Sequence, residues 1–180
     1  MANKILLLPG WMTGLELYKK QDNLDIKIGK TNIEDNDVCL IGLSLGALVA
    51  LRDWNHSNKL ILINPPLPNR SVFVWFIRWC KYILVEGLFL ERQKFTKNPF
   101  KYTLEVARCI KLLQVNFFEK LENISKENVV VIRGKKDNFF CDNDAVQFLR
   151  SKGFQVIEVE GCGHNWCENI EKTMIEFTNL

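Results

Sequence analysis

Short apolar runs alternate with longer amphipathic stretches along most of the chain. The short runs predict strands and cover residues 4–8, 24–28, 38–43, 60–64, 129–133 and 154–158. Helical patterns follow three of them, over 45–54, 144–152 and 166–178. Strands that alternate with helices favour a parallel sheet covered on both faces. We therefore predict an α/β protein with a mostly parallel sheet of about six strands.

Residues 67–124 break this rhythm. The stretch 71–86 is apolar on nearly all sides and rich in aromatic residues, and Asn98-Pro99 is typical of a helix start. The insertion holds ten basic and five acidic residues, so it is more basic than the rest of the chain. We predict one domain, built from 1–66 and 125–180, with 67–124 inserted as a helical cap over one end of the sheet.

Composition narrows the class of protein. The chain has 180 residues, 47% of them hydrophobic and 25% charged, which indicates one folded globular domain. Its net charge of +3 is small for a nucleic-acid-binding protein. The first apolar run stops at Pro9-Gly10, too early for a secretory leader, and Arg78 and Lys81 interrupt the apolar stretch 72–85, which argues against a membrane span. We expect a cytoplasmic protein.

In a reducing compartment cysteines remain thiols. We therefore expect the six cysteines to be free and mostly buried, as small apolar side chains. They are Cys39, Cys80, Cys109, Cys141, Cys162 and Cys167.

The strongest chemical signal is the segment Gly42-Leu43-Ser44-Leu45-Gly46. It directly follows a predicted buried strand and opens a helix, the context that makes a G-x-S-x-G pattern a nucleophile elbow. Such a turn holds the serine hydroxyl at the carboxyl end of the sheet, where a helix N-terminus favours developing negative charge. We predict Ser44 as a nucleophile; the alternative is a serine that caps an ordinary strand-to-helix turn.

A nucleophilic serine needs a base, and the chain has two histidines. His164 follows the last strand, and connections that leave the carboxyl ends of parallel strands gather at one edge of the sheet. We therefore expect His164 beside Ser44. His56 follows the helix after Ser44, so we expect it at the far end of that helix, in solvent.

The base in turn needs a carboxylate that orients its ring. Asp137 follows the strand 129–133 and lies at the same predicted edge, and Asp142 is the second candidate. An acyl oxygen would need hydrogen-bond donors. We expect these from the backbone N–H of Leu45, directly after the serine, and of Trp11, in the loop after the first strand.

A metal site is a different possibility for the same region. Cys162, His164 and Cys167 are potential ligands, and Cys141 is a fourth. Their spacing lacks the paired cysteines of a structural zinc site, and no glycine-rich phosphate loop is present. We therefore expect no metal and no cofactor.

Together these segments resemble the α/β-hydrolase family. The elbow at 42–46, the loop 134–137 and the Gly163-His164 turn occur in the family's order of Ser, Asp and His, and Pro9-Gly10-Trp11 is similar to its oxyanion loop. The resemblance covers nearly the whole chain and implies a three-layer α/β-hydrolase fold with 67–124 as the cap.

The chain also departs from the family pattern. Pro9 stands where many members have histidine, the first strand corresponds to the family's third, and 30–37 is too short for the usual crossover helix. The resemblance therefore implies a reduced member of the family.

Within the family, the Pro-Gly-Trp and Gly-Leu-Ser-Leu-Gly segments are similar to those of esterases that cleave pimeloyl-carrier-protein methyl ester in biotin synthesis. This implies a serine carboxylesterase that releases methanol and meets an acidic acyl carrier protein through a basic cap. The expected carrier contacts are Arg70 and Arg78, and the expected pocket residues are Trp75, Phe76 and Trp79. A solvated helix face and ordinary cap packing explain the same residues.

Two further functions fit the same sequence. One is an acyl thioesterase or lipid esterase with the same three residues. The other is a non-catalytic binding protein on a hydrolase scaffold.

Overall fold

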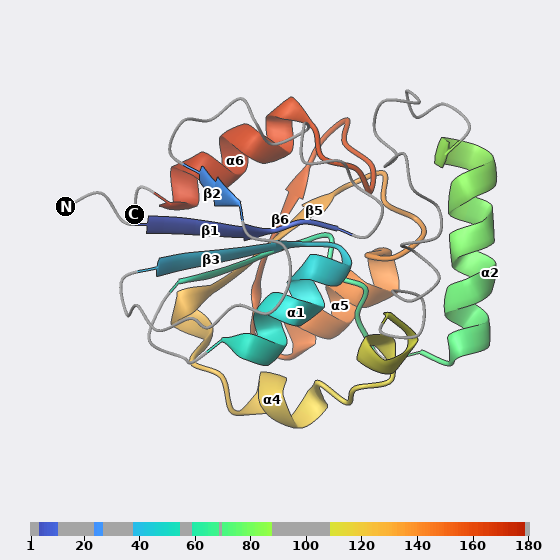
Figure 1. Cartoon of the computed structure of the whole chain (residues 1–180), viewed down its shortest axis with the longest axis horizontal. Coiled ribbons are helices and arrows are strands. Elements are labelled where there is room, and N and C mark those ends of the chain that lie inside the picture. The colour runs from blue at the N-terminus through green and yellow to red at the C-terminus, as the bar shows by residue number, and fades with distance from the viewer. Residues whose placement is uncertain are drawn as a thin grey trace.

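A parallel sheet forms the centre of the protein (Figure 1). The structure is a computed structural model that describes residues 4–10, 24–26, 38–54, 59–68, 70–87 and 109–178. Its six strands run in the order β2-β1-β3-β4-β5-β6, and every neighbouring pair is parallel. The strands are β1 (Lys4–Leu8), β2 (Leu24–Ile26), β3 (Val38–Leu43), β4 (Leu60–Ile63), β5 (Val129–Gly134) and β6 (Gln155–Val159). The sheet predicted from the apolar runs is confirmed.

Alternate residues of the central strands β1, β3, β4 and β5 pack into two apolar clusters on opposite faces of the sheet, because successive side chains of a strand point in opposite directions. Leu6, Leu40 and Leu62 belong to one cluster, whereas Leu7 and Ile41 belong to the other. The first face is covered by α1 (Leu45–Asp53), α4 (Phe118–Glu122) and α5 (Asn143–Ser151). The second face is covered by α6 (Glu168–Thr178), which completes three layers (Figure 1).

Helix α2 (Val72–Tyr82) stands at the edge of the molecule toward which the strands point (Figure 1). It begins at Ser71, whose hydroxyl accepts a hydrogen bond from the Val74 N–H, and the π-helical turn η2 (Ile83–Gly87) continues it. Several apolar side chains of this segment are exposed, among them Phe73 at 70% and Leu84 at 65%. The helices in the described ranges all fall short of the length and apolar character that a bilayer crossing requires.

The rest of the predicted insertion is described only from residue 109 onward, so the helix start expected at Asn98-Pro99 lies outside the described residues. Residues 109–113 are helical, a 3-10 turn, η4 (Lys126–Asn128), precedes β5, and α4 lies between them. Phe117, Leu121 and Ile124 are buried in the same apolar cluster as α1. This end of the segment 67–124 therefore packs as part of the core.

Candidate active site

Ser44 stands on a sharp turn between β3 and α1. Its backbone has φ 53° and ψ −121°, a conformation that costs free energy for a residue with a β-carbon. The Ser44 N–H donates to the Ile63 carbonyl over 2.8 Å, and the Ala47 N–H donates to the Ser44 carbonyl over 2.9 Å. These bonds hold the Ser44 side chain at the carboxyl end of β3.

The glycines on either side of Ser44 allow close packing of this turn. A β-carbon on Gly42 would lie 2.4 Å from Ala47 Cα, and one on Gly46 would lie 2.2 Å from the Leu8 carbonyl oxygen. Neither contact can be relieved by moving a flexible side chain, because both neighbours are backbone atoms. The G-x-S-x-G spacing is therefore required by the way α1 packs against β1 and β3.

His164 lies between the two other predicted residues. Its Nε2 is 2.8 Å from Ser44 Oγ, and its Nδ1 is 2.6 Å from Asp137 Oδ2. His164 is buried and Asp137 is completely buried. When the ionised Asp137 accepts a hydrogen bond from Nδ1–H, the proton of the neutral ring stays on Nδ1. The lone pair on Nε2 is then free to accept the proton of the Ser44 hydroxyl. Three groups distant in the sequence thus form one line of hydrogen bonds. The other histidine, His56, lies outside the described residues.

The surroundings of Asp137 favour its charged form. Burial raises the pKa of Asp137, but the attraction of His164 and several hydrogen bonds outweigh burial, so this pKa lies below its ordinary value. The N–H groups of Phe139 and Phe140 donate to Oδ1 over 3.0 Å, and that of Cys141 donates to Oδ2 over 3.1 Å. Asp137 is therefore anionic at neutral pH, and its carboxylate is oriented by backbone as well as by His164.

A buried arginine supports the same turn, and we did not predict it. The Arg133 Nη2 donates to the Asp137 carbonyl over 3.1 Å, and its Nη1 donates to Asn143 Oδ1 over 2.8 Å and to Glu158 Oε2 over 3.0 Å. Arg133 thus ties the turn of Asp137 to α5 and β6. The available signal was a charged residue at the end of an otherwise apolar strand run.

Asn64, at the end of β4, is a second polar residue that sequence reasoning missed. It is completely buried and has φ 46°. Its Oδ1 accepts the Gly134 N–H over 2.8 Å, and its Nδ2 donates to the carbonyls of His164 over 2.9 Å and Gly163 over 3.2 Å. The signal was an asparagine at the carboxyl end of a buried strand, since asparagine tolerates positive φ better than most residues.

Asp142, the second candidate for the carboxylate, lies outside the line of hydrogen bonds. It caps α5 by accepting the Ala145 N–H over 3.1 Å, so the helix predicted to begin at residue 144 begins at Asn143. Arg70 donates to both Asp142 oxygens over 2.7 and 3.0 Å, and Arg78 donates to Asp142 Oδ2 over 2.6 Å. Both arginines therefore join the segment of α2 to Asp142 at the start of α5. Both charges are thus paired within the molecule, and the role of Arg70 and Arg78 as carrier-protein contacts stays a prediction.

The two predicted oxyanion donors are described unequally. Leu45 is the first residue of α1, where backbone N–H groups lack an acceptor within the helix. Trp11 lies outside the described residues, but Gly10 directly before it is next to Ser44: a β-carbon on Gly10 would lie 3.3 Å from Ser44 Cβ. The loop that leads to Trp11 therefore begins beside Ser44.

Aromatic side chains of α2 and of the loop after β5 lie against His164. The Phe140 ring centroid is 4.4 Å from that of His164, and the Tyr82 ring meets His164 edge-on at 5.5 Å. Trp75 is buried and stacks on Phe140 at 6.2 Å. The end of α2 and the loop after β5 thus shield the imidazole from solvent.

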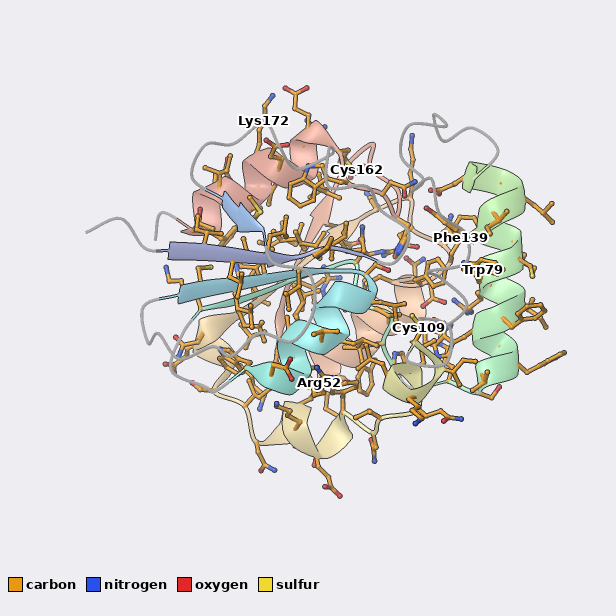
Figure 2. The ribbon with its side chains drawn as sticks, in the orientation of Figure 1. Arg52, Trp79, Cys109, Phe139, Cys162 and Lys172 are labelled. Atoms are coloured by element: carbon orange, nitrogen blue, oxygen red, sulfur yellow. A yellow bond between two sulfur atoms is a disulfide. The ribbon has the colours of Figure 1, made fainter. Side chains whose placement is uncertain are left out.

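The three predicted pocket residues differ in their placement. Trp75 lies between α2 and the core, as its stacking on Phe140 shows. Trp79, labelled on α2 in Figure 2, is half-buried. Phe76 is 58% exposed, so most of its ring meets solvent.

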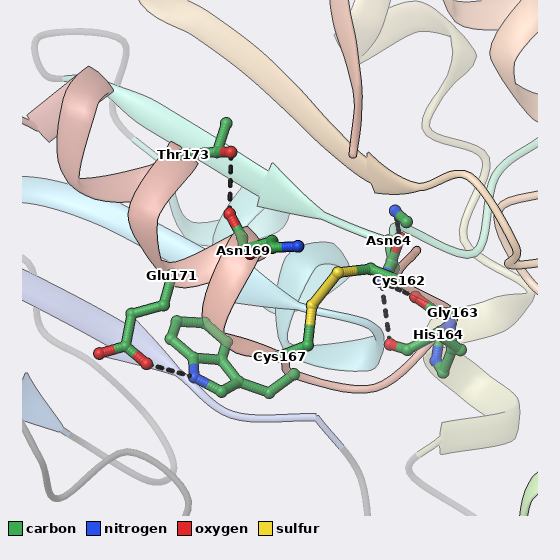
Figure 3. The surroundings of a disulfide bond; sticks show 10 residues. Asn64, Cys162, Gly163, His164, Cys167, Asn169, Glu171 and Thr173 are labelled. Carbon is green, nitrogen blue, oxygen red and sulfur yellow. Dashed lines mark hydrogen bonds between the residues drawn. A yellow bond between two sulfur atoms is a disulfide. The ribbon is translucent and has the colours of Figure 1, made fainter. Parts of the chain in front are cut away.

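A disulfide brackets the turn of His164 and corrects the expectation of six free thiols. Cys162 and Cys167 are joined, with their Cα atoms 6.5 Å apart (Figure 3). The turn that presents His164 reverses the chain and brings the two sulfurs together, which spacing alone does not show. Cys39 and Cys141 are buried thiols, as expected, and burial raises the pKa of Cys39 to about 11.

The disulfide also bears on the metal alternative. Bonded to each other, Cys162 and Cys167 offer no thiolate to a metal ion. In the ranges that the structure describes, no three side chains of His, Cys, Asp or Glu are arranged to hold a metal.

Comparison with known proteins identifies the fold. No protein-family model and no curated protein sequence matches the chain. Among solved structures, it is similar to MGS-M2, an α/β-hydrolase enzyme from a Medee basin deep-sea metagenome library (12% identity, TM-score 0.59, covering 99% of this chain and 88% of that one).

Two further structures are similar over most of both chains. They are an E-2-(acetamidomethylene)succinate hydrolase (13% identity, TM-score 0.63, covering 97% of this chain and 90% of that one) and a carboxylesterase of Nitrososphaera gargenis (12% identity, TM-score 0.59, covering 96% and 87%). With its parallel sheet, its covering helices and these similarities, the chain has the α/β-hydrolase fold.

Proposed function

We propose that the protein is a serine hydrolase that cleaves carboxylic esters through a covalent acyl intermediate on Ser44. The observation that carries the proposal is the line of hydrogen bonds from Ser44 Oγ through His164 to Asp137. A base that is itself oriented by a buried carboxylate is the arrangement that activates a serine hydroxyl for acyl transfer. The strained backbone of Ser44 is typical of catalytic sites and supports the same proposal.

In the first half of the reaction, Ser44 Oγ attacks the ester carbonyl carbon while its proton moves to His164 Nε2. Asp137 stabilises the imidazolium that forms. The carbonyl oxygen becomes an oxyanion, which the Leu45 N–H and, in this proposal, the Trp11 N–H stabilise. The bond to the alcohol oxygen then breaks, the alcohol takes the proton from His164, and the acyl group remains on Ser44.

In the second half, water replaces the alcohol. His164 takes a proton from the water as the water oxygen attacks the acyl carbon, and a second oxyanion forms at the same donors. Its collapse breaks the bond to Ser44 Oγ, which receives the proton back. The free acid leaves, and no cofactor takes part in either half.

The test compares wild type with Ser44→Ala on a short p-nitrophenyl ester. We expect the variant to lose turnover and labelling by a fluorophosphonate probe while it keeps its circular dichroism spectrum. Ser125→Ala, which changes an exposed serine before β5 in the same way, is the matched control and should match wild type. Equal hydrolysis by Ser44→Ala and wild type would refute the assignment.

Within the ester class we propose pimeloyl-carrier-protein methyl ester as the substrate, with methanol as a product. Two features support this: the segments 9–11 and 42–46 resemble those of the biotin-synthesis esterases, and the insertion 67–124 is basic. The acyl chain would pass beside Phe140, whose ring lies against His164, and beside Trp75, which stacks on Phe140. Arg70 and Arg78 are the proposed carrier contacts, but both also bind Asp142, so the exposed Lys81 of α2 is the cation chosen to test the contact.

A pair of substrates tests this finer proposal. We expect Lys81→Glu to slow hydrolysis of the methyl ester on acyl carrier protein more than hydrolysis of a free methyl ester. Lys172→Glu on α6 is the control for the charge reversal. If Lys81→Glu slows both esters equally, the proposal of a carrier-borne substrate is wrong. If wild type hydrolyses an acyl thioester faster than either ester, the thioesterase alternative is favoured.

A further inference from the structure

We propose that Asn64 is a positioning residue that sets the contact between His164 and Asp137; this rests on the proposed function. The hydrogen bonds of the Asn64 side chain go to backbone atoms and not to the side chains of that pair. It binds the backbone of the two loops that carry them, and it reaches both loops from a third strand end.

The first loop is the one that leads to Asp137. The Asn64 Oδ1 accepts the N–H of Gly134, the last residue of β5, over 2.8 Å. The Asp137 N–H donates to the Gly134 carbonyl over 2.8 Å, which closes the turn. Asn64 therefore fixes the residue from which the Asp137 turn starts.

The second loop is the one that carries His164. The Asn64 Nδ2 donates to the carbonyl oxygens of His164 over 2.9 Å and of Gly163 over 3.2 Å. These bonds fix the backbone of the residue whose ring must reach Ser44 and Asp137 together. Figure 3 shows Asn64 beside Gly163 and His164.

The two loops touch each other at the point where Asn64 binds both. A β-carbon on Gly134 would lie 2.0 Å from the Gly163 carbonyl oxygen, and the Lys136 N–H donates to the Cys162 carbonyl over 2.8 Å. A single carboxamide supplies the acceptor for one loop and the donor for the other, which neither a carboxylate nor an apolar side chain can do. Without it, buried backbone groups of both loops would lack a partner, and the loops would shift to recover one.

The shift matters because proton transfer depends on small distances. The His164 ring is held at 2.6 Å from Asp137 and 2.8 Å from Ser44, and a displacement of about 1 Å can lower a rate by about 100-fold. We therefore expect the loss of the carboxamide to lower kcat with little change in KM.

The test uses two variants and a control. Asn64→Gly removes the carboxamide, and glycine accepts the φ of 46° without strain. Asn64→Asp keeps the side-chain volume and the acceptor for Gly134 but places an oxygen against the carbonyls of Gly163 and His164. Asn123→Asp makes the same chemical change at an exposed asparagine that binds the Glu119 carbonyl, far from the site in sequence.

We measure kcat and KM on a p-nitrophenyl ester, and separately the downfield proton resonance of His164 Nδ1–H bound to Asp137. Both Asn64 variants should lower kcat by about 100-fold and shift or broaden the resonance, whereas Asn123→Asp should change neither. Should Asn64→Gly fail to fold, Asn64→Asp carries the test. A folded Asn64 variant with kcat within about threefold of wild type and an unchanged resonance would overturn the proposal.

The resonance needs no substrate, so it separates this inference from the proposed function. If wild type and Ser44→Ala cleave the ester equally, the proposed function fails, yet the resonance still reports whether Asn64 sets the His164–Asp137 contact. A purely structural role would lower the melting temperature of the Asn64 variants and leave the resonance in place.

Discussion

The carboxylate of Glu86, in the cap, accepts a hydrogen bond over 3.2 Å from the side chain of Asn165, the residue that follows His164. The Asn165 Oδ1 accepts a second bond from the Tyr82 hydroxyl over 2.5 Å. Glu86 also lies against the other side of the turn, since a β-carbon on Gly163 would be 3.1 Å from its Oε1. The segment that follows α2 thus places a second carboxylate on the turn that carries His164.

The position of Glu86 predicts a pH-dependent stability. Burial raises the pKa of Glu86, and the charge of Asp137 raises it further, which the attraction of His164 only partly offsets. A carboxyl whose pKa is higher in the folded than in the unfolded state binds its proton more readily when folded. The free energy of unfolding therefore falls as pH rises from the ordinary pKa of 4.5 through the raised value.

Glu86→Gln removes this loss, because glutamine stays neutral. We expect the variant to unfold at a higher urea concentration than wild type at neutral pH, with the difference vanishing below the ordinary carboxyl pKa. Glu119→Gln, at an exposed position on α4, is the control. A stability difference between Glu86→Gln and wild type that does not change with pH would contradict the prediction.

Under the proposed function, Asp137→Asn should lower kcat by about 10,000-fold, as loss of the orienting carboxylate does in a known protease with a Ser-His-Asp triad. The carboxamide fits the same space, but its NH₂ group faces His164 Nδ1 and favours the ring tautomer that carries its proton on Nε2. That proton blocks the lone pair which would accept the Ser44 hydroxyl proton. Steady-state kinetics measure the effect, and a kcat within about tenfold of wild type would show that Asp137 does not orient the base.

Asp142→Asn should lower the free energy of unfolding by about 2 kcal/mol, since it weakens charged hydrogen bonds from both Arg70 and Arg78. Burial raises the pKa of Asp142, but the hydrogen bonds from Arg70, Arg78 and the Ala145 N–H together lower it more, so this contribution is present above the ordinary pKa and lost as pH falls through the lowered pKa. Asp144→Asn is the control, because that carboxylate is 79% exposed and lies 4.0 Å from Arg70 Nη2, beyond hydrogen-bond distance. Urea denaturation at neutral pH decides; equal midpoints for the two variants would rule out Asp142 as the anchor of α2.

Removal of the disulfide should lower the free energy of unfolding by about 2 kcal/mol. This is the contribution expected from the loop-closure entropy of the unfolded chain for a separation of five residues between Cys162 and Cys167. The double variant Cys162→Ser with Cys167→Ser is compared with Cys80→Ser on α2 by urea denaturation. A reducing agent should lower the midpoint of wild type and leave that of the double variant unchanged. If the agent acts equally on both, the bond does not stabilise this turn.

Local pattern accounts for what could be predicted from the sequence. The apolar runs 38–43 and 60–64 predict buried parallel strands because a strand buried on both faces cannot alternate with polar residues. Since loops after parallel strands meet at one edge of the sheet, the sequence alone predicts that Ser44, Asp137 and His164 lie together.

Tertiary structure decided the partners of the polar groups. Asp142 and Asp137 follow the same strand, and only their surroundings separate them: Asp137 meets His164, and Asp142 meets the arginines of α2. The roles of Asn64 and Arg133 and the pairing of Cys162 with Cys167 depend in the same way on contacts between loops. Sequence spacing determines which residues reach the edge of the sheet, but hydrogen bonds act over about 3 Å, a distance that only the packed chain sets.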